Sequence, residues 1–398
     1  MSYAQNSGVP SVVVAAGTYS TLTVAGTQTV TIVGPTATAV SDNSVVIASS
    51  GTVGSLVIGS NSIKGATFRN LNFTNTAASG VGPAVAVRGS NIAFYGCALV
   101  SSAQGVYSAS YGTALIADSY IEGTDKLFYN YPTAYIFRST IVPTMSGASI
   151  LYSKGATISG VTYNSSIVVD SSSVAAKSGL ATNNVYLATP NGATGYVTAI
   201  YRNSSLGSLI ATSGVYSTAC SVATNFGEFE TTGAGSYANN AASRGSTSCD
   251  YALSASQVSA YTIDQVYSKA FSPYGNSDTT WVDSGVLAAI QSYDSAQVAA
   301  APSSTSSSSS IASTGTVSAS STTSTASATC ATPTPGATLV VSLNATSCQY
   351  SNVSSAIHAL PNDSQAYTIL IKPGTLQRAT QRYSQRQSDL DRRDVFRQ

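Results

Sequence analysis

A short motif recurs through the chain at a nearly constant spacing, and this repeat constrains the fold more than any other feature. It is a polar step followed by an apolar residue, as in NLNF, GCAL, DSYI, RSTI and GVTY. The apolar residues are Phe73, Leu99, Ile121, Ile141 and Tyr163, separated by 26, 22, 20 and 22 residues. A unit of this length holds two or three short strands and cannot bury its apolar face alone, so it stacks on its neighbours as a solenoid.

The residues between these motifs favour strands over helices. From residue 11 to about residue 169, β-branched apolar runs alternate with Gly, Ser and Asn, a pattern typical of short strands. We therefore predict an all-β fold, a right-handed parallel β-helix over residues 1–300 whose amino-terminal cap is missing. One of its sheets is expected to line a long groove, which suits a polymer. The less regular residues 179–283 are expected to cap the solenoid, and Ser284 to Ala300 to form a closing helix.

The rest of the chain differs in composition. Residues 301–335 are almost entirely Ser, Thr, Ala and Pro, which predicts a disordered Ser/Thr-rich linker. Residues 336–377 contain TILIKPGTL, which mirrors SVVVAAGTY near the start of the chain. We interpret this segment as the truncated start of a second copy of the domain. Residues 378–398 hold six arginines and are expected to be a disordered tail.

The composition favours a secreted glycoprotein. Charged residues make up 8% of the chain, about a third of the usual share, so Ser, Thr, Asn and Tyr must make the surface polar. Six Asn-x-Ser/Thr sequons point the same way. They begin at Asn72, Asn164, Asn203, Asn344, Asn352 and Asn362. The opening MSYAQNSGVP has neither the basic start nor the apolar stretch of a signal peptide, so we expect the natural chain to begin upstream.

Several partners are not expected. Without its arginine-rich tail the chain has a small net negative charge, so nothing invites nucleic acid, and no run of 18 apolar residues predicts a membrane span. His358 is the only histidine and no CxxC motif occurs, so we expect no metal. Cys97 lies in an apolar run and is predicted to be a buried thiol. Two pairs are candidate disulfides, Cys220 with Cys249 and Cys330 with Cys348.

In the order and spacing of its motifs, the chain resembles the pectinesterase family of carbohydrate esterases. The matching pieces are VVVAAGTYSTLTV, VTIVG, ATFRNLNFTNTA, AVAVRG, FYGCAL, AQGVY, YIEGTDKLF and FGEFETTGAG. They cover about residues 10–285, and a partial second match covers about 336–376. The resemblance implies a parallel β-helix of the pectin lyase-like kind, a monomer that uses no cofactor and removes methyl groups from pectin at a plant or fungal cell wall.

The resemblance implies Asp125 as the catalytic nucleophile, which attacks the ester carbonyl. The family's Asp-x-x-Phe corresponds to Asp125 and Phe128 if one residue is deleted after Gly123. Without that deletion, Lys126 takes the position of the nucleophile. Because neighbours on a strand face opposite ways, only one of Asp125 and Lys126 is expected to face the groove in regular β structure. Lys126 in the groove would suit a free galacturonate carboxylate. Asp125 also has a structural reading, as a turn acid paired with Lys126.

Other positions depart from the family pattern. In AQGVY, Gln104 falls either on the oxyanion donor or on the general acid, and the acid is lost in both registers. Pro83 and Thr189 stand where the family has an oxyanion Gln and an Arg that orients the nucleophile, and Asn191 replaces a groove Trp. We predict Asp125 and Gln104 as catalytic residues, and Lys126, Tyr107 and Tyr129 as substrate-binding residues, with the tyrosines stacking on sugar rings.

Two hypotheses follow. In the first, the chain is a pectinesterase that hydrolyses galacturonate methyl esters. In the second, it is a catalytically inactive β-helix that serves as a pectin-binding or structural module, because catalytic groups act as a unit and several are lost. A polygalacturonase or a lyase fits poorly, since neither a groove histidine nor a Ca²⁺-binding acid cluster can be found.

Overall fold

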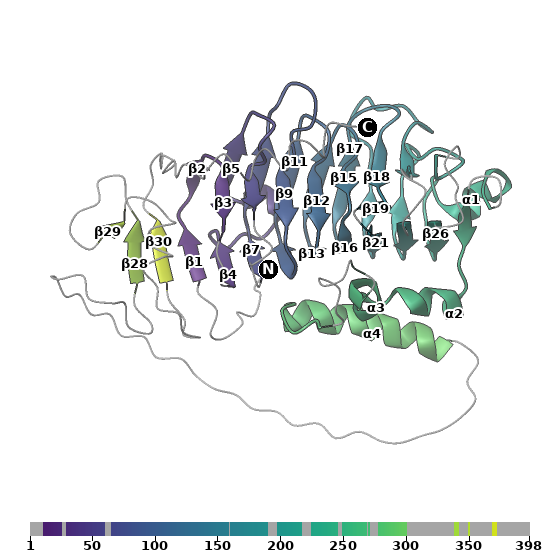
Figure 1. Ribbon diagram of the computed structural model, residues 1–398. Helices are drawn as coiled ribbons and strands as arrows, with labels where there is room; N and C mark the ends of the chain where they lie inside the picture. Colours follow the sequence, from purple (N-terminus) through teal and green to yellow (C-terminus); the bar gives the residue numbers. More distant parts are fainter. Residues whose placement is uncertain are drawn as a thin grey trace, which may run out of the picture.

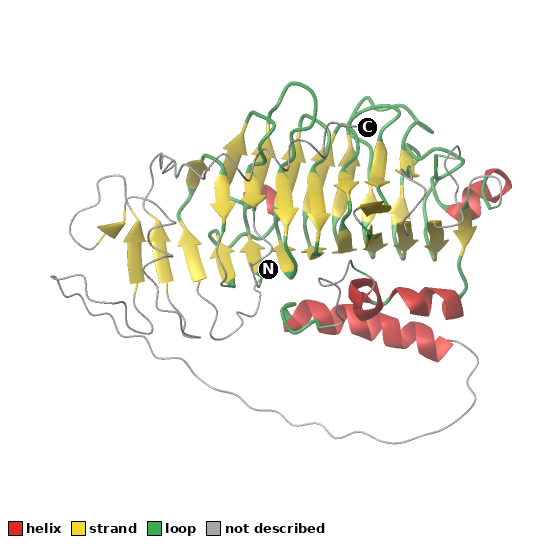
Figure 2. Cartoon of the chain, viewed as in Figure 1, coloured by secondary structure: helices red, strands yellow, loops and turns green. Residues whose placement is uncertain are grey.

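The computed structural model describes residues 11–25, 29–59, 65–158, 160–189, 197–216, 224–245, 249–268, 270, 278–300, 338–341, 349–350 and 368–371. In this part the chain winds through three parallel sheets, here named A, B and C, and forms the predicted parallel β-helix (Figure 1). Helices lie along one side of the solenoid (Figure 2). No described helix is both long enough and apolar enough to cross a membrane.

From Ser11 to Ala188, each coil contributes one strand to each sheet in turn. Sheet A has the order β27 (Asp250–Ala252), β26 (Thr224–Phe229), β24 (Val197–Arg202), β21 (Ser165–Asp170), β16 (Thr133–Phe137), β13 (Thr113–Ala117), β10 (Ile92–Tyr95), β7 (Ala66–Arg69), β4 (Val30–Val33), β1 (Ser11–Val14), β30 (Thr368–Ile371), β28 (Thr338–Val341), β29 (Gln349–Tyr350). Sheet B has the order β2 (Gly17–Tyr19), β5 (Val45–Ser49), β8 (Asn72–Asn75), β11 (Ala98–Ser101), β14 (Tyr120–Gly123), β17 (Thr140–Pro143), β22 (Ser173–Val174), β25 (Ser205–Leu206). Sheet C has the order β23 (Tyr186–Ala188), β18 (Ser149–Ser153), β15 (Phe128–Asn130), β12 (Tyr107–Tyr111), β9 (Val85–Arg88), β6 (Leu56–Ile58), β3 (Leu22–Val24).

The sequence repeat is a ladder of inward residues on sheet B. Phe73, Leu99, Ile121 and Ile141 are register partners on successive strands, and all four are fully buried. Tyr163 does not continue this ladder, because it lies in an antiparallel hairpin of β19 (Ala156–Ile158) and β20 (Val161–Tyr163). The hairpin is inserted between β18 and β21, and the next residue of the ladder is instead Val174.

Serines form a second ladder at the corner between sheets A and B. The backbone N–H of each of Cys97, Ser119, Ser139 and Ser172 donates to the serine Oγ of the next coil at 3.0–3.1 Å, ending at Ser204. The residue before each ladder serine has a φ near +50°. The corner thus satisfies buried N–H groups that no strand pairs, which explains the recurrent polar step in the sequence.

Helices cover the outer face of sheet A, so this sheet is buried on both sides. Its strands β10, β13 and β16 are buried at every residue, which is why they read as continuous apolar runs. The longest helix is α4 (Ser284–Ala300), as predicted. The shorter helices are α1 (Tyr237–Asn240), α2 (Ala255–Val258), α3 (Ile263–Ser268) and the 3₁₀ turns η1 (Val40–Asp42), η3 (Ala241–Ser243) and η4 (Ser259–Tyr261).

The prediction for residues 179–283 was wrong in one respect. These residues do not only cap the solenoid, because β24 and β26 continue sheet A with six residues each. The loops between these strands are rich in turn residues, and they hid the strand pattern in the sequence. The coverage of sheet A then comes from α3 and α4, whose Tyr267, Val286 and Ile290 pack in one apolar cluster with the outward residues of sheet A.

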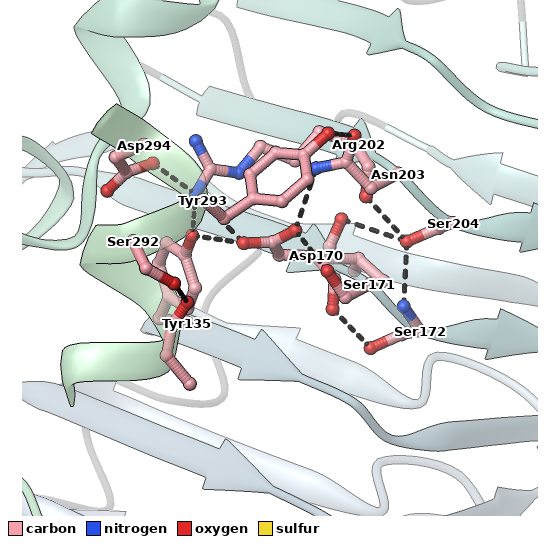
Figure 3. Close-up of polar contacts among 12 residues, drawn as sticks. Tyr135, Asp170, Ser171, Ser172, Arg202, Asn203, Ser204, Ser292, Tyr293 and Asp294 are labelled. Atoms are coloured by element: carbon pink, nitrogen blue, oxygen red, sulfur yellow. Dashed lines mark hydrogen bonds and ion pairs between the residues drawn. The ribbon is translucent and has the colours of Figure 1, made fainter. Parts of the chain in front are cut away.

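Two ion pairs fix helix α4 on sheet A. At its start, Asp283 caps the helix by accepting from the N–H groups of Gly285 and Val286, and its other oxygen lies 3.3 Å from Arg69 Nη2. Toward its end, Asp294 lies 2.6 Å from Arg202 Nη2. Figure 3 shows Arg202 between Asp294 of the helix and Asp170 of β21, which lies 2.8 Å away.

Cys97 is a buried free thiol, as predicted, and burial raises its pKa to about 12. Cys249 is disulfide-bonded. Its candidate partner Cys220, the pair Cys330 and Cys348, and His358 lie outside the described residues. So do the predicted linker and the arginine-rich tail.

Candidate functional site

Three of the residues predicted for the site meet in one turn of the solenoid. Asp125 and Lys126 lie between β14 and β15, and Gln104 lies one coil earlier. Lys126 Nζ donates to Gln104 Oε1 at 3.2 Å and lies 3.9 Å from Asp125 Oδ2. The expectation that only one of Asp125 and Lys126 faces the groove assumed regular β structure. Lys126 instead has a φ of +51°, and this left-handed turn brings both side-chain heads together.

Asp125 joins three successive coils. Its carbonyl oxygen accepts from the N–H of Gly105 in the coil before. Its Oδ1 accepts from the N–H of Ser149 in the coil after, at 2.9 Å. The side chain is 14% exposed, so Oδ2 is the oxygen left to meet Lys126 or a ligand. The carboxylate therefore has a structural part in the turn besides any chemical part.

Two tyrosines and a second lysine extend this site along sheet C. Tyr129 on β15 and Tyr152 on β18 are register partners, with ring centroids 6.0 Å apart. Lys126 Nζ lies 4.7 Å from the centroid of the Tyr152 ring. Lys154 Nζ lies 5.2 Å from that of Tyr129. Both distances are those of cation–π contacts. The face therefore alternates cations with aromatic rings, and we name it the lysine–tyrosine face: Gln104, Asp125, Lys126, Tyr129, Tyr152 and Lys154.

Tyr152 and Lys154 were not among the residues predicted for the site. The signal was the repeat itself, because Tyr152 follows Tyr129 by about one coil and therefore stacks on it. The interruptions between β15 and β18 obscured this relation in the sequence.

Tyr107 is not part of the site. It is 2% exposed and belongs to the core, with its ring centroid 6.3 Å from that of Phe94 and 6.0 Å from that of Phe128. Burial raises the pKa of its phenol well above the usual value. Its register partners Val85 and Phe128 also form the inner ladder of sheet C, so a sugar ring cannot reach this side chain.

The other acids of nearby coils are engaged elsewhere. Glu122 on β14 of sheet B pairs with Lys177 and accepts from the hydroxyl of Tyr120. Asp118, at the corner after β13, pairs with Arg138 at 2.9 Å. Within the described residues, no group of three or more His, Cys, Asp or Glu side chains is arranged to hold a metal ion.

At the positions where the family has an oxyanion Gln and an Arg, the described residues supply no side chain that could take over these roles. Ala103, which takes the position of an oxyanion Gln when Gln104 falls on the general acid, is buried. The backbone N–H of Thr189 donates to Leu151 O, as a strand-end residue does. Asn191 lies outside the described residues. Asp125 is thus the one carboxylate that the structure brings to the lysine–tyrosine face among the residues described.

No family model matches the sequence, and no curated protein matches it. Several solved structures do match this chain. The pectin methylesterase from carrot matches with a TM-score of 0.53 and 19% identity, over 66% of this chain and 86% of the carrot chain. A mutant pectin methylesterase in complex with a hexasaccharide has a TM-score of 0.50 and 16% identity, over 66% and 90%. The enzyme from Aspergillus niger has a TM-score of 0.49 and 21% identity, over 62% and 92%.

The chain therefore has the fold of the pectin methylesterases, a pectin lyase-like parallel β-helix. At these identities the likeness establishes the fold. What the protein does has to be argued from its own residues.

Proposed function

We propose that this protein binds pectin on its lysine–tyrosine face and acts as a binding module at the cell wall. The observation that carries the proposal is the position of Lys126, whose Nζ lies over the Tyr152 ring and within hydrogen-bond distance of Gln104 Oε1. A cation beside aromatic faces and an amide is suited to galacturonate, which combines a carboxylate, hydroxyls and an apolar ring face.

Each group has a part in this binding. The rings of Tyr129 and Tyr152 offer faces for sugar rings, and their phenol oxygens offer hydrogen bonds. Lys126 and Lys154 offer two positive charges on neighbouring coils for the carboxylates of demethylated units. The face is expected to prefer pectin of low methylation, because a methyl ester removes the charge that the lysines would meet.

A second candidate function is hydrolysis of galacturonate methyl esters, which the position of Asp125 favours. Its Oδ2 lies 3.9 Å from Lys126 Nζ, which in turn contacts Gln104, so a carbonyl carbon placed beside Oδ2 would meet a nucleophile near an ammonium and an amide donor. The attack expels methoxide, which needs a proton, and water must then hydrolyse the anhydride that joins Asp125 to the galacturonate acyl group. Lys126 is the group in reach that could donate the proton, since the described residues bring no second acid to this face.

The binding proposal is tested with the full chain and pectins of low and high methylation. Lys126→Met should lower the affinity for low-methyl pectin by about tenfold, which corresponds to one charge-assisted contact of about 1.4 kcal/mol. Lys177→Met is the matched control, because Lys177 is an exposed cation that follows β22 and pairs with Glu122 on sheet B. Equal affinities for wild type and Lys126→Met by affinity electrophoresis would contradict the proposal.

Methanol release from highly methylated pectin separates the two functions. A binding module releases none above a buffer control while still retaining the polymer. An esterase releases methanol, and Asp125→Asn should abolish it. Because the amide oxygen that this substitution introduces can still accept from the N–H of Ser149, the variant keeps the turn, and circular dichroism checks that it folds.

The remaining expectations rest on this function. Pectin is an extracellular polymer, so we propose that the protein is secreted and glycosylated, and that it acts as a monomer without a cofactor or nucleic acid partner. Fractionation of a culture expressing the natural gene into medium and cells tests the location.

A further inference from the structure

The C-terminal strands lie at the opposite end of the chain from β1 and yet pair with it. β30 pairs with β1 in parallel, with Ser11 opposite Thr368 and Val14 opposite Ile371. β28 pairs with β30 on the far side, and β29 follows. Figure 1 shows these strands continuing sheet A beyond the first coil. We infer that the strands β28, β29 and β30 form the end cap of the β-helix within the same molecule, at the end where β1 lies.

The internal sequence repeat supports this inference. TILIKPGTL and SVVVAAGTY align without a gap, and the register of β30 on β1 is the same alignment: Thr368, Ile369, Leu370 and Ile371 stand opposite Ser11, Val12, Val13 and Val14. In a solenoid, equivalent residues of successive coils stack on one another. The C-terminal segment therefore occupies the place of a preceding coil, although it comes last in the sequence.

The burial of side chains on β1 and β28 also supports an end cap. Val12 and Val14 of β1 are 1% and 3% exposed, although no described strand precedes β1 in the sequence. Leu339 of β28 is 5% exposed and belongs to the main core. Without the C-terminal strands, β1 would offer a free edge with unpaired N–H and C=O groups, which invites association between copies. The new outermost strand, β29, has only two residues, and a very short edge strand limits such pairing.

The length of the intervening chain fits a cap within one molecule. Asp294 of α4 contacts Arg202 on β24. β28 begins directly after residue 337, and nine strand spacings separate it from β24 in sheet A, about 43 Å. A chain of 37 residues, the number from 301 to 337, reaches at most about 120–130 Å when fully extended, so its length is sufficient for this distance. A connection that can span its two ends raises the effective concentration of the segment it carries, so pairing of β30 with β1 of the same chain is favoured over pairing with another copy.

Paired cysteines in the full chain test the inference. Val13 is 41% exposed and stands opposite Leu370, and register partners in a parallel ladder lie on the same face about 5 Å apart. The variant Val13→Cys/Leu370→Cys should form a disulfide within one chain in most molecules. The matched control Val13→Cys/Ile369→Cys places the second cysteine one residue out of register, on the opposite face, and should cross-link at least tenfold less.

Mass spectrometry of the cross-linked peptides and non-reducing gels give the readout. Equal cross-linking in the two variants, or cross-links that join two chains into dimers, would overturn the inference.

A second variant tests the inference without cysteines. Ile369→Pro removes a ladder hydrogen bond, and it should lower Tm by about 5 °C or more and promote self-association. Ser320→Pro, in the intervening chain, should do neither. Equal Tm values for wild type and both variants would also overturn the inference.

Discussion

At the scale of single residues, one backbone conformation decides the candidate site. The left-handed φ of Lys126 breaks the alternation of side chains, so a carboxylate and an ammonium that are neighbours in sequence share one side of the turn. Lysine rarely adopts this conformation, and no residue in GTDKLF marks it. Sequence analysis could therefore find both residues and still leave open which of them faces the groove.

Another residue should make the stability depend on pH. Asp250, at the start of β27, is buried beside Arg244 with the two charged groups 3.4 Å apart. Burial outweighs the effect of Arg244 and raises the Asp250 pKa to about 7, whereas an unfolded Asp has a pKa near 3.9. Between these values the folded state binds the proton more tightly, so this contribution to stability is full below about pH 4 and is lost as the pH rises to about 7.

Urea unfolding at pH 5 and pH 8 measures this effect. The free energy of unfolding of the wild type should fall by on the order of 2–3 kcal/mol between these pH values through Asp250. Asp250→Asn keeps the shape of the side chain without titrating. The fall in its free energy of unfolding between pH 5 and pH 8 should therefore be smaller than that of the wild type by this amount. Asp42→Asn, at an exposed residue, serves as control and should follow the wild type. A change in Asp250→Asn as large as that in the wild type would contradict the prediction.

At the scale of elements, the position of α4 depends on the buried cluster shown in Figure 3. Arg202 is 1% exposed and faces Asp170 and Asp294. The hydroxyl of Tyr135 also donates to Asp170 Oδ2 at 2.6 Å. Removing one member of such a cluster leaves a buried charge without its partner, which costs far more than losing an exposed pair.

Arg202→Met should therefore lower the free energy of unfolding by about 3–5 kcal/mol. Arg138→Met, which breaks the pair of the 44% exposed Arg138 with Asp118, should cost less than about 1 kcal/mol. The double variant Arg202→Met/Asp294→Leu should recover part of the loss, because it removes one of the two uncompensated carboxylates. Chemical denaturation of the three variants measures these differences, and similar losses in both single variants would argue against the cluster as the anchor of α4.

At the scale of the whole molecule, the sequence predicts the solenoid better than its ends. The ladder Phe73, Leu99, Ile121 and Ile141 was readable because each coil repeats one inward position. The sequence also indicates that the C-terminal segment resembles the start of the domain, but no local pattern tells a strand which edge it will pair with. The site was half predictable: Asp125, Lys126, Gln104 and Tyr129 came from motifs, whereas Tyr152 and Lys154 enter it only through the stacking of coils.

The sequon at Asn203 shows the same limit. A sequon is a local signal, and it predicts an accessible amide. In the folded chain the Asn203 amide donates to Asp170 Oδ1 at 3.1 Å and accepts from the hydroxyl of Tyr293. This side chain belongs to the buried cluster beneath α4, so the glycan expected at Asn203 does not fit the structure.

The extent of the lysine–tyrosine face predicts how binding should depend on the length of the ligand. Gln104, Lys126 and Tyr152 lie on three successive coils, which together extend about 10 Å along the solenoid axis. A sugar unit is comparable in length with one strand spacing, so two or three units fill the face. The affinity for unmethylated oligogalacturonates should rise by about tenfold from one unit to three, a gain of about 1.4 kcal/mol, and little beyond. The affinity should weaken with added salt, because ionic strength screens exposed charges.

Calorimetry with oligomers of one to six units measures both trends, and fully methylated oligomers serve as the uncharged control. A steady rise through six units would place the ligand on a longer surface than this face, and an affinity insensitive to salt would mean that the lysines do not meet the carboxylates.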